Sequence, residues 1–227
     1  MDSLLKPLPR ALLIAPVIIF SAAAYFWSYS LHPVWWLVWL APLPLLLIAP
    51  RVSAWTAAVM AFCAVTLGRL DMWAYYRMLH LQLWLILTVV LGPALVVASA
   101  ICLCRSFFLR RQLARAVLVF PAVIVAAEYL ISLWQGTFGN TAYTQLRNLP
   151  VLQLGALTGL WGIAFVVMLV PAMAAVVLLT RGRERARMAS ALTLVVASVL
   201  IYGAWRLHST PAASPTVLVG LAESHIP

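Results

Sequence analysis

The segment VLQLGALTGLWGIAFVVMLVPAMAAVVLLT, residues 151–180, carries no charged side chain. A helical span of a bilayer core about 30 Å thick needs roughly 20 apolar residues, so this segment can cross a membrane. Because it is longer than one perpendicular crossing, we expect its helix to tilt, to protrude or to begin with a broken piece. Its continuous Leu, Val and Ala runs do not alternate in polarity, which favours a helix over a barrel strand.

The composition of the whole chain agrees with a membrane protein. Of the 227 residues, 65% are hydrophobic and only 9% are charged, whereas soluble domains are about one quarter charged. Windows of suitable length, bounded by charges or turn residues, predict an all-α polytopic membrane protein with about seven transmembrane helices. The predicted spans are Ala11–Ser30, Val34–Ala49, Ala54–Gly68, Leu81–Cys104, Ala116–Trp134, Val151–Thr180 and Met188–Trp205.

Two regions next to these spans are expected to be irregular. Pro42 and Pro44 interrupt the second span, and two prolines so close together kink or break a helix. The segment Gly68–Trp84 mixes aromatic and basic residues. This mixture favours an amphipathic segment that lies among the lipid head groups.

The basic residues are distributed unequally between the two sides of the membrane. With a cytoplasmic N-terminus, 11 of the 15 Lys and Arg residues fall on the cytoplasmic side and 4 on the other. This excess predicts that orientation and a periplasmic C-terminus. Because the basic residues form no single patch, the net charge of +10 does not indicate a nucleic-acid partner. The RGRERAR run at residues 181–187 is expected to face anionic head groups from the inner side.

No metal site or cofactor is predicted. Cys63, Cys102 and Cys104 lie within or at the inner end of spans and lack the spacing of a redox or zinc motif. His80 has no second histidine near it in the sequence.

The fifth span contains an acidic residue, Glu128, six residues before Trp134. At 1.5 Å per residue it lies roughly 9 Å below the outer interface. A carboxylate at such a depth normally faces the bundle interior and has a partner, which makes Glu128 a candidate site residue. The alternative is a structural acid that is hydrogen-bonded to a neighbouring helix or reached by water.

The loop QGTFGNTAYTQLRNLP, residues 135–150, follows this span. Gly136 and Gly139 permit tight backbone geometry, and Phe138 and Tyr143 provide amphipathic contacts. Uncharged hydrogen-bonding groups complete the loop, namely Asn140, Thr141, Thr144 and Gln145. This density is typical of a loop that holds a lipid head group or a peptide end at the membrane surface.

The end of the chain changes in character. HSTPAASP, residues 208–215, is a polar linker, and the apolar, β-branched run Thr216–Leu221 that follows it resembles a buried strand. We therefore expect a helical membrane domain over residues 1–207 and a linker over 208–215. Residues 216–227 are then either a loose end or the truncated first strand of another domain.

Four segments, in order, resemble the membrane domain of bacterial apolipoprotein N-acyltransferases. They are WLVWLAPLPLLL at 36–47, PAVIVAAEYLISLW at 121–134, GTFGNTAYTQ at 136–145 and LPVLQLGALTGLWGIAFVVMLVPA at 149–172. The resemblance implies a protein of the bacterial inner membrane in which seven helices precede an extracytoplasmic nitrilase-like α/β domain. In that family a Glu, Lys and Cys set transfers an acyl chain from a phospholipid to the α-amino group of a lipoprotein.

That catalytic set belongs to the nitrilase-like domain, so no catalytic residue is assigned to this chain and whether it acts as an enzyme stays open. The loop also departs from the family pattern, because GTFGN stands where Gly-Phe-Pro-Trp is usual, although AYTQ resembles Gly-Tyr-Ser-Gln. The membrane part of a related amidase with another acceptor is therefore an alternative.

The resemblance predicts that this membrane domain docks a phospholipid and a lipoprotein substrate, and that its partner is a nitrilase-like domain encoded separately. The predicted docking residues are Glu128, Trp134, Gly136, Phe138, Tyr143, Gln145 and Arg147. A non-enzymatic scaffold or small transporter is the rival class. A proton-coupled transporter would need several paired polar residues within its spans, and Glu128 is nearly alone.

Overall fold

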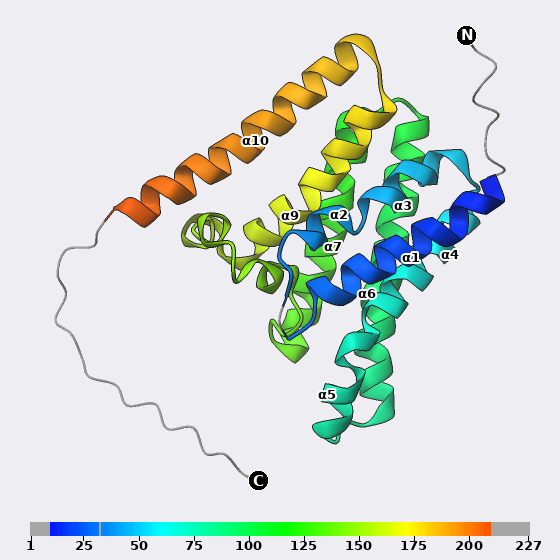
Figure 1. The fold of residues 1–227 in the computed structure, drawn as a ribbon, viewed down its shortest axis with the longest axis vertical. Helices are drawn as coiled ribbons and strands as arrows, with labels where there is room; N and C mark the ends of the chain where they lie inside the picture. Colours follow the sequence, from blue (N-terminus) through cyan, green and yellow to red (C-terminus); the bar gives the residue numbers. More distant parts are fainter. Residues whose placement is uncertain (1–9, 32, 210–227) are drawn as a thin grey trace.

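The computed structural model describes residues 10–31 and 33–209, and the regular elements in this part of the chain are all helices, as predicted. Figure 1 shows the helices forming a bundle from which the last one, α10, stands apart. The helices are α1 (Arg10–Ser28), α2 (Leu37–Leu40), α3 (Leu43–Ile48), α4 (Ala54–Gly68), α5 (Trp73–Met78), α6 (Leu83–Leu109), α7 (Leu113–Gln135), α8 (Leu149–Leu152), α9 (Gly155–Leu179) and α10 (Gly182–His208). Short 3₁₀ turns are η1 (Ala49–Arg51), η2 (Leu70–Met72) and η3 (Thr141–Gln145).

Within the described residues, five helices are long and apolar enough to cross a membrane, which makes this a multi-pass membrane protein. They cover Ala54–Met78, Leu83–Leu109, Leu113–Trp134, Gly155–Leu179 and Gly182–His208. The first two of the seven predicted spans correspond to shorter apolar helices, Leu13–Ser28 and Leu37–Arg51. The structure thus supports five spans by length and adds two shorter apolar segments.

The predicted break in the second span is confirmed. Helix α2 ends at Leu40 and α3 begins at Leu43, with Pro42 directly before α3 and Pro44 in its first turn. Proline is tolerated in a first turn because the N–H group that it lacks has no intrahelical acceptor there. Two short helices therefore replace one straight crossing.

The long apolar segment at residues 151–180 begins with a broken piece, which was one of the three predicted outcomes. Helix α8 ends at Leu152, and α9 starts only at Gly155. Gly159 lies inside α9 with φ 63° and ψ −161°, a backbone conformation that is open to glycine and strained for other residues. The break shortens the regular helix that has to fit the bilayer.

The core of the bundle is built from small and branched residues. Helix α4 packs against α1 and α6, α6 packs against α7, and α7 packs against α9. Ala61, Ala64, Ala94 and Ala100 are fully buried between these helices. Small side chains let helix backbones approach closely, which is the usual basis of helix packing in membranes.

Helix α10 contacts the rest of the protein mainly through α8 and α9. Gly203 is its one buried residue. A Cβ atom at position 203 would lie 2.0 Å from the carbonyl oxygen of Pro150. The α10 contact with α8 therefore depends on the absence of a side chain at this position.

The connections between helices gather at two opposite ends of the bundle. At one end, Arg105 of α6 donates from Nε to the carbonyl oxygen of Ala49 at 3.0 Å and from Nη2 to that of Val52 at 2.9 Å. At the other end, Tyr29, Arg69 and the loop after α7 lie together. We call these the inner end and the outer end, after the orientation predicted from charge.

His208 closes α10, and the predicted strand at residues 216–221 lies outside the described residues, as does most of the predicted linker.

Candidate functional site

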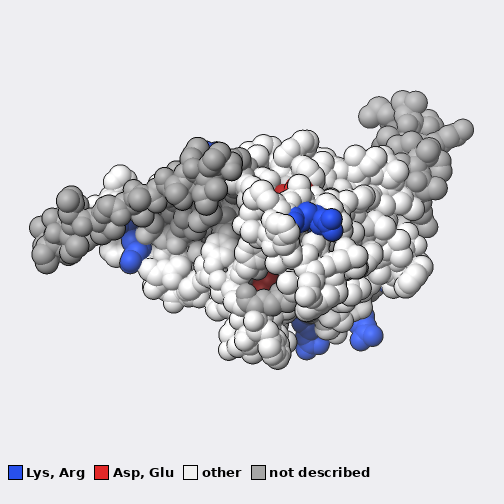
Figure 2. Space-filling view, turned by 90° about the horizontal axis from the view of Figure 1, so that it is seen from below, with Lys and Arg blue, Asp and Glu red and all other residues white. Residues whose placement is uncertain are grey.

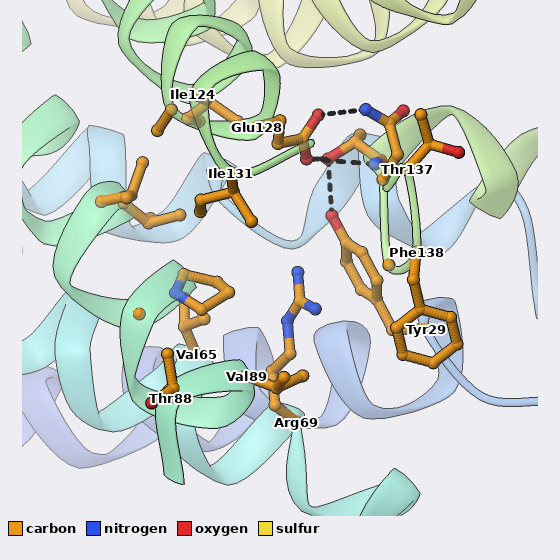
Figure 3. Close-up of a pocket in the computed structure, with 18 of the residues that line it drawn as sticks. Tyr29, Val65, Arg69, Thr88, Val89, Ile124, Glu128, Ile131, Thr137 and Phe138 are labelled. Atoms are coloured by element: carbon orange, nitrogen blue, oxygen red, sulfur yellow. Dashed lines mark hydrogen bonds between the residues drawn. The ribbon is translucent and has the colours of Figure 1, made fainter. Parts of the chain in front are cut away.

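Glu128 projects from α7 towards the loop that follows that helix, which we call the outer loop and define as residues 136–148. Its Oε2 accepts a hydrogen bond from Asn140 Nδ2 at 2.9 Å. Its Oε1 accepts two more, from the backbone N–H of Thr141 at 3.1 Å and from the Thr141 hydroxyl at 2.5 Å (Figure 3). The carboxylate therefore orders the outer loop against the end of α7.

The network continues to the end of α1. The Tyr29 hydroxyl lies 2.9 Å from Thr141 Oγ1. Because Thr141 uses its one hydroxyl proton on Glu128, Tyr29 is the donor in this second hydrogen bond. One chain of hydrogen bonds thus joins Thr141 and Glu128 to Tyr29, which lies 112 positions before Thr141 in the sequence.

Gln145 ties the outer loop to the second apolar segment. Its Oε1 accepts hydrogen bonds from Trp39 Nε1 at 3.0 Å and from Asn148 Nδ2 at 3.1 Å. Its Nε2 donates to the carbonyl oxygen of Trp35 at 3.0 Å and to Thr144 Oγ1 at 3.0 Å. The side chain is fully buried, and its polar atoms are all engaged within the protein.

The outer loop has the tight geometry that its glycines predict. Gly136 has φ 68° and Gly139 has φ 74°, both in the left-handed region that favours glycine. Asn140 Oδ1 accepts a hydrogen bond from the backbone N–H of Ala142 at 2.8 Å, which closes the turn into η3. The Tyr143 hydroxyl lies 2.6 Å from Thr137 Oγ1.

A cavity of about 130 Å³ lies beneath this loop, and we call it the outer pocket. Its floor is buried and mostly apolar, formed by Val65, Val97, Ile124, Met168 and Tyr25, whose hydroxyl has no hydrogen-bond partner among the described residues. Its rim consists of partly or fully exposed residues on α6, α7 and the outer loop, namely Thr88, Ile131, Gly136 and Phe138. The outer pocket therefore opens on the side where α6 and α7 face the surroundings.

Arg69, directly after α4, carries the one basic side chain among the described residues that line the outer pocket. Its guanidinium carbon lies 4.1 Å from the centre of the Tyr29 ring, a cation–π distance. Its Nε atom is buried and has no hydrogen-bond partner among the described residues. In Figure 3 the guanidinium points into the space between Tyr29 and Ile131.

The surface around the outer end carries little charge. Figure 2 views the molecule from the end at which α5 lies and shows a mostly uncharged face with a few separate basic side chains, and with acidic atoms visible only in recesses. Within the described chain, no cluster of three or more His, Cys, Asp or Glu residues could hold a metal ion.

The structure separates the seven predicted docking residues into two groups. Glu128, Gly136 and Phe138 line the outer pocket. The other four do not: Trp134 is 81% exposed, Arg147 is exposed, Tyr143 contacts Thr137 within the outer loop and Gln145 is fully buried. The role of all seven residues in docking stays a prediction.

Sequence reasoning missed the contribution of Arg69 and Tyr29. In the sequence, Arg69 is one of the basic residues of the segment Gly68–Trp84, for which an interfacial segment is favoured over a substrate contact, and Tyr29 carries no signal of its own. Both lie in segments remote from Glu128 in the sequence, and periodicity does not indicate which helix ends meet. The one available signal was an arginine at the very end of an apolar span.

The sequence of this polytopic helical bundle, with its half-buried acid, outer loop and pocket, was compared with known families. The family model of the apolipoprotein N-acyltransferase N-terminal domain matches residues 21–173, so the chain belongs to this family as its membrane domain. The match includes all seven predicted docking residues and Arg69, and it ends before α10. No curated protein gives a match to the chain.

Proposed function

We propose that this membrane domain receives the acyl chain of a phospholipid in the outer pocket, for transfer to a lipoprotein by a nitrilase-like catalytic domain. The observation that carries this proposal is the outer pocket itself, which has a buried, mostly apolar floor and a rim of exposed residues on α6, α7 and the outer loop. An acyl chain can enter such a pocket directly from the bilayer without crossing water. A water-soluble substrate would first have to pass through the hydrocarbon region of the bilayer.

The outer loop supports this proposal through its position and its rigidity. It covers the outer pocket with Gly136, Phe138 and Gly139, and Glu128 and Gln145 hold it by hydrogen bonds. A preorganised cover keeps a bound chain in one place with little loss of conformational entropy on binding. Trp134, Tyr143 and Arg147 lie near the same surface and are proposed to contact the glycerol region or the lipoprotein acceptor.

Family membership supports the substrate class and the setting in the bacterial inner membrane. It does not assign chemistry to this chain, because the Glu, Lys and Cys set of the family belongs to the nitrilase-like domain. We therefore assign docking of the lipid to the described residues and acyl transfer to that domain, in a separate chain or in a longer form of this one.

A photo-crosslinking experiment tests the docking step. The purified chain is placed in nanodiscs that contain a phospholipid with a diazirine in one acyl chain, and the crosslinked residues are mapped by mass spectrometry. We expect crosslinks to be enriched at Val89, Ile131 and Phe138 of the outer pocket relative to Leu194 and Ile201, which are exposed on α10. Equal labelling of the two sets would contradict a specific site and would favour a scaffold without lipid substrate.

A further inference from the structure

The outer pocket contains a positive charge that the protein itself does not neutralise by a hydrogen bond. Arg69 Nε is buried without a partner among the described residues. The two nearby acids do not provide one: the three hydrogen bonds that Glu128 accepts come from Asn140 and Thr141, and the oxygens of Asp71 are themselves buried without a partner among the described residues. A cation in such surroundings is costly unless it is paired.

The contact with Tyr29 offsets only part of this cost. The guanidinium carbon lies 4.1 Å from the centre of the Tyr29 ring, a cation–π contact. A guanidinium group has five N–H donors, and one aromatic contact does not occupy them all. Arg69 therefore keeps donors, Nε among them, for an oxyanion, for which the planar fork is well suited.

The position of Arg69 specifies the kind of molecule that carries the oxyanion. Arg69 follows Gly68, the last residue of α4, and so lies at the outer end of the bundle. The apolar floor of the outer pocket, including Val65 and Val97, lies on the side of the bilayer core. A ligand that uses both features has an anionic group at the interface and an alkyl chain below it, as a lipid has.

We propose that Arg69 binds the phosphate group of a membrane phospholipid whose acyl chain begins in the outer pocket beside Val89 and Ile131. This inference deepens the proposed function and rests on it for the location of the lipid. The cavity of about 130 Å³ is similar in size to the engineered 150 Å³ cavity of another protein that binds benzene. It therefore holds the first few methylene groups, and the rest of the chain leaves over the exposed rim residues of α6 and α7.

Three probes separate the head group from the chain. Dodecyl phosphate has both, dodecanol has the chain alone and inorganic phosphate has the head alone. Each is titrated by calorimetry into the full chain in dodecyl maltoside, a detergent without charge. We expect measurable affinity for dodecyl phosphate, much weaker binding of dodecanol and no binding of inorganic phosphate at the same concentrations.

The variant Arg69→Gln removes the charge while keeping a polar side chain. We expect it to bind dodecyl phosphate at least about tenfold more weakly, as for the loss of one charged hydrogen bond. Arg69→Lys keeps the charge without the fork and should be intermediate. Arg77→Gln is the matched control, because Arg77 is an exposed arginine on α5 that does not line the outer pocket, and its affinity should equal that of the wild type.

A second variant keeps the test decisive if Arg69→Gln does not fold. Ile131→Trp fills the rim of the outer pocket while Arg69 stays in place, and we expect it to lose the dodecyl phosphate signal. Unchanged affinity in Arg69→Gln, or in a folded Ile131→Trp, would overturn the proposal. If dodecanol and dodecyl phosphate bind with equal affinity, the phosphate does not contribute to binding. If inorganic phosphate binds as strongly as dodecyl phosphate, the alkyl chain does not contribute.

The two proposals fail in different ways. If acyl-chain crosslinks map to the outer pocket but Arg69→Gln binds dodecyl phosphate normally, the phosphate site is wrong and the proposed function stands. If dodecyl phosphate binding depends on Arg69 but phospholipid crosslinks are not enriched in the outer pocket, the site recognises another anionic amphiphile and the proposed function fails.

Discussion

Glu128 shows how a single residue can serve the fold and border a binding site at once. The sequence left two readings open, a site residue or a structural acid with a partner. In the structure its oxygens accept three hydrogen bonds from Asn140 and Thr141, while the same side chain forms part of the wall of the outer pocket. The donors offset the cost of burying the carboxylate, and the outer loop gains a fixed position.

Substitution of Glu128 should therefore destabilise the outer end, and by more in Glu128→Ala than in Glu128→Gln. Glu128→Gln replaces one acceptor oxygen by an NH₂ group that faces the donor Asn140 Nδ2, which we expect to cost about 1–3 kcal/mol. Glu128→Ala leaves the donors of both Asn140 and Thr141 without their acceptor and should cost more. Thermal unfolding in dodecyl maltoside tests this order. The unfolding temperature should be highest for the wild type, lower for Glu128→Gln and lowest for Glu128→Ala.

The control for this series is Glu184→Gln on the exposed first turn of α10, which should stay within about 0.5 kcal/mol of the wild type, as for most surface substitutions. Limited proteolysis of the outer loop gives a second readout, because a loop released from Glu128 should be cut faster. Equal stability of Glu128→Ala and the wild type would show that the three hydrogen bonds contribute nothing net.

Among the helices, α10 offers the sharpest test of packing. Its contact with α8 depends on Gly203, where a Cβ atom would lie 2.0 Å from the carbonyl oxygen of Pro150. Gly203→Ala should therefore separate α10 from α8 and lower the stability by about 1–3 kcal/mol, as overpacking does. The matched control is Gly92→Ala, since a Cβ atom there meets nothing within 4 Å. It should leave the unfolding temperature unchanged or raise it, and a loss as large as that of Gly203→Ala would contradict the packing argument.

The inner end provides a second test between elements. Arg105 joins α6 to η1 and the turn before α4 through the carbonyl oxygens of Ala49 and Val52. Charged hydrogen bonds are worth about 1.5–3 kcal/mol, so Arg105→Gln should lower stability by roughly that amount. Arg110→Gln, at an exposed position one turn later, is the control and should have little effect. Similar unfolding temperatures for the two variants would show that the Arg105 contacts are dispensable.

The sequence predicted most of the elements because they follow local rules. Two close prolines break the second segment, and the apolar segment at 151–180 is too long for one crossing, so each irregularity has a cause within a few residues. The contacts between elements were not predicted. Gln145 meets Trp39 across 106 positions, and Tyr29 meets Thr141 across 112. Hydrophobic patterns mark spans without indicating which of their ends become neighbours.

At the scale of the whole molecule, the inner and outer ends of the bundle differ in composition and in contacts. The inner end carries most of the basic residues and closes tightly through Arg105, whereas the outer end contains the outer pocket and the hydrogen-bond network of Glu128. Docking of a lipid at the outer end requires that this end faces the periplasm in the cell. The orientation is thus a premise of both proposals and can be measured directly.

The orientation is tested by cysteine labelling in a variant whose three native cysteines, Cys63, Cys102 and Cys104, are replaced by alanine. Single cysteines are introduced at uncharged, exposed positions so that the charge balance stays intact: Met78 and Leu146 at the outer end, Leu109 and Ala186 at the inner end. Since 11 of the 15 Lys and Arg residues belong to the inner side, we expect a membrane-impermeant maleimide to label Met78→Cys and Leu146→Cys in spheroplasts. Leu109→Cys and Ala186→Cys should react only after the membrane is permeabilised. The reverse pattern would place the outer pocket in the cytoplasmic leaflet, away from any periplasmic catalytic domain and lipoprotein acceptor.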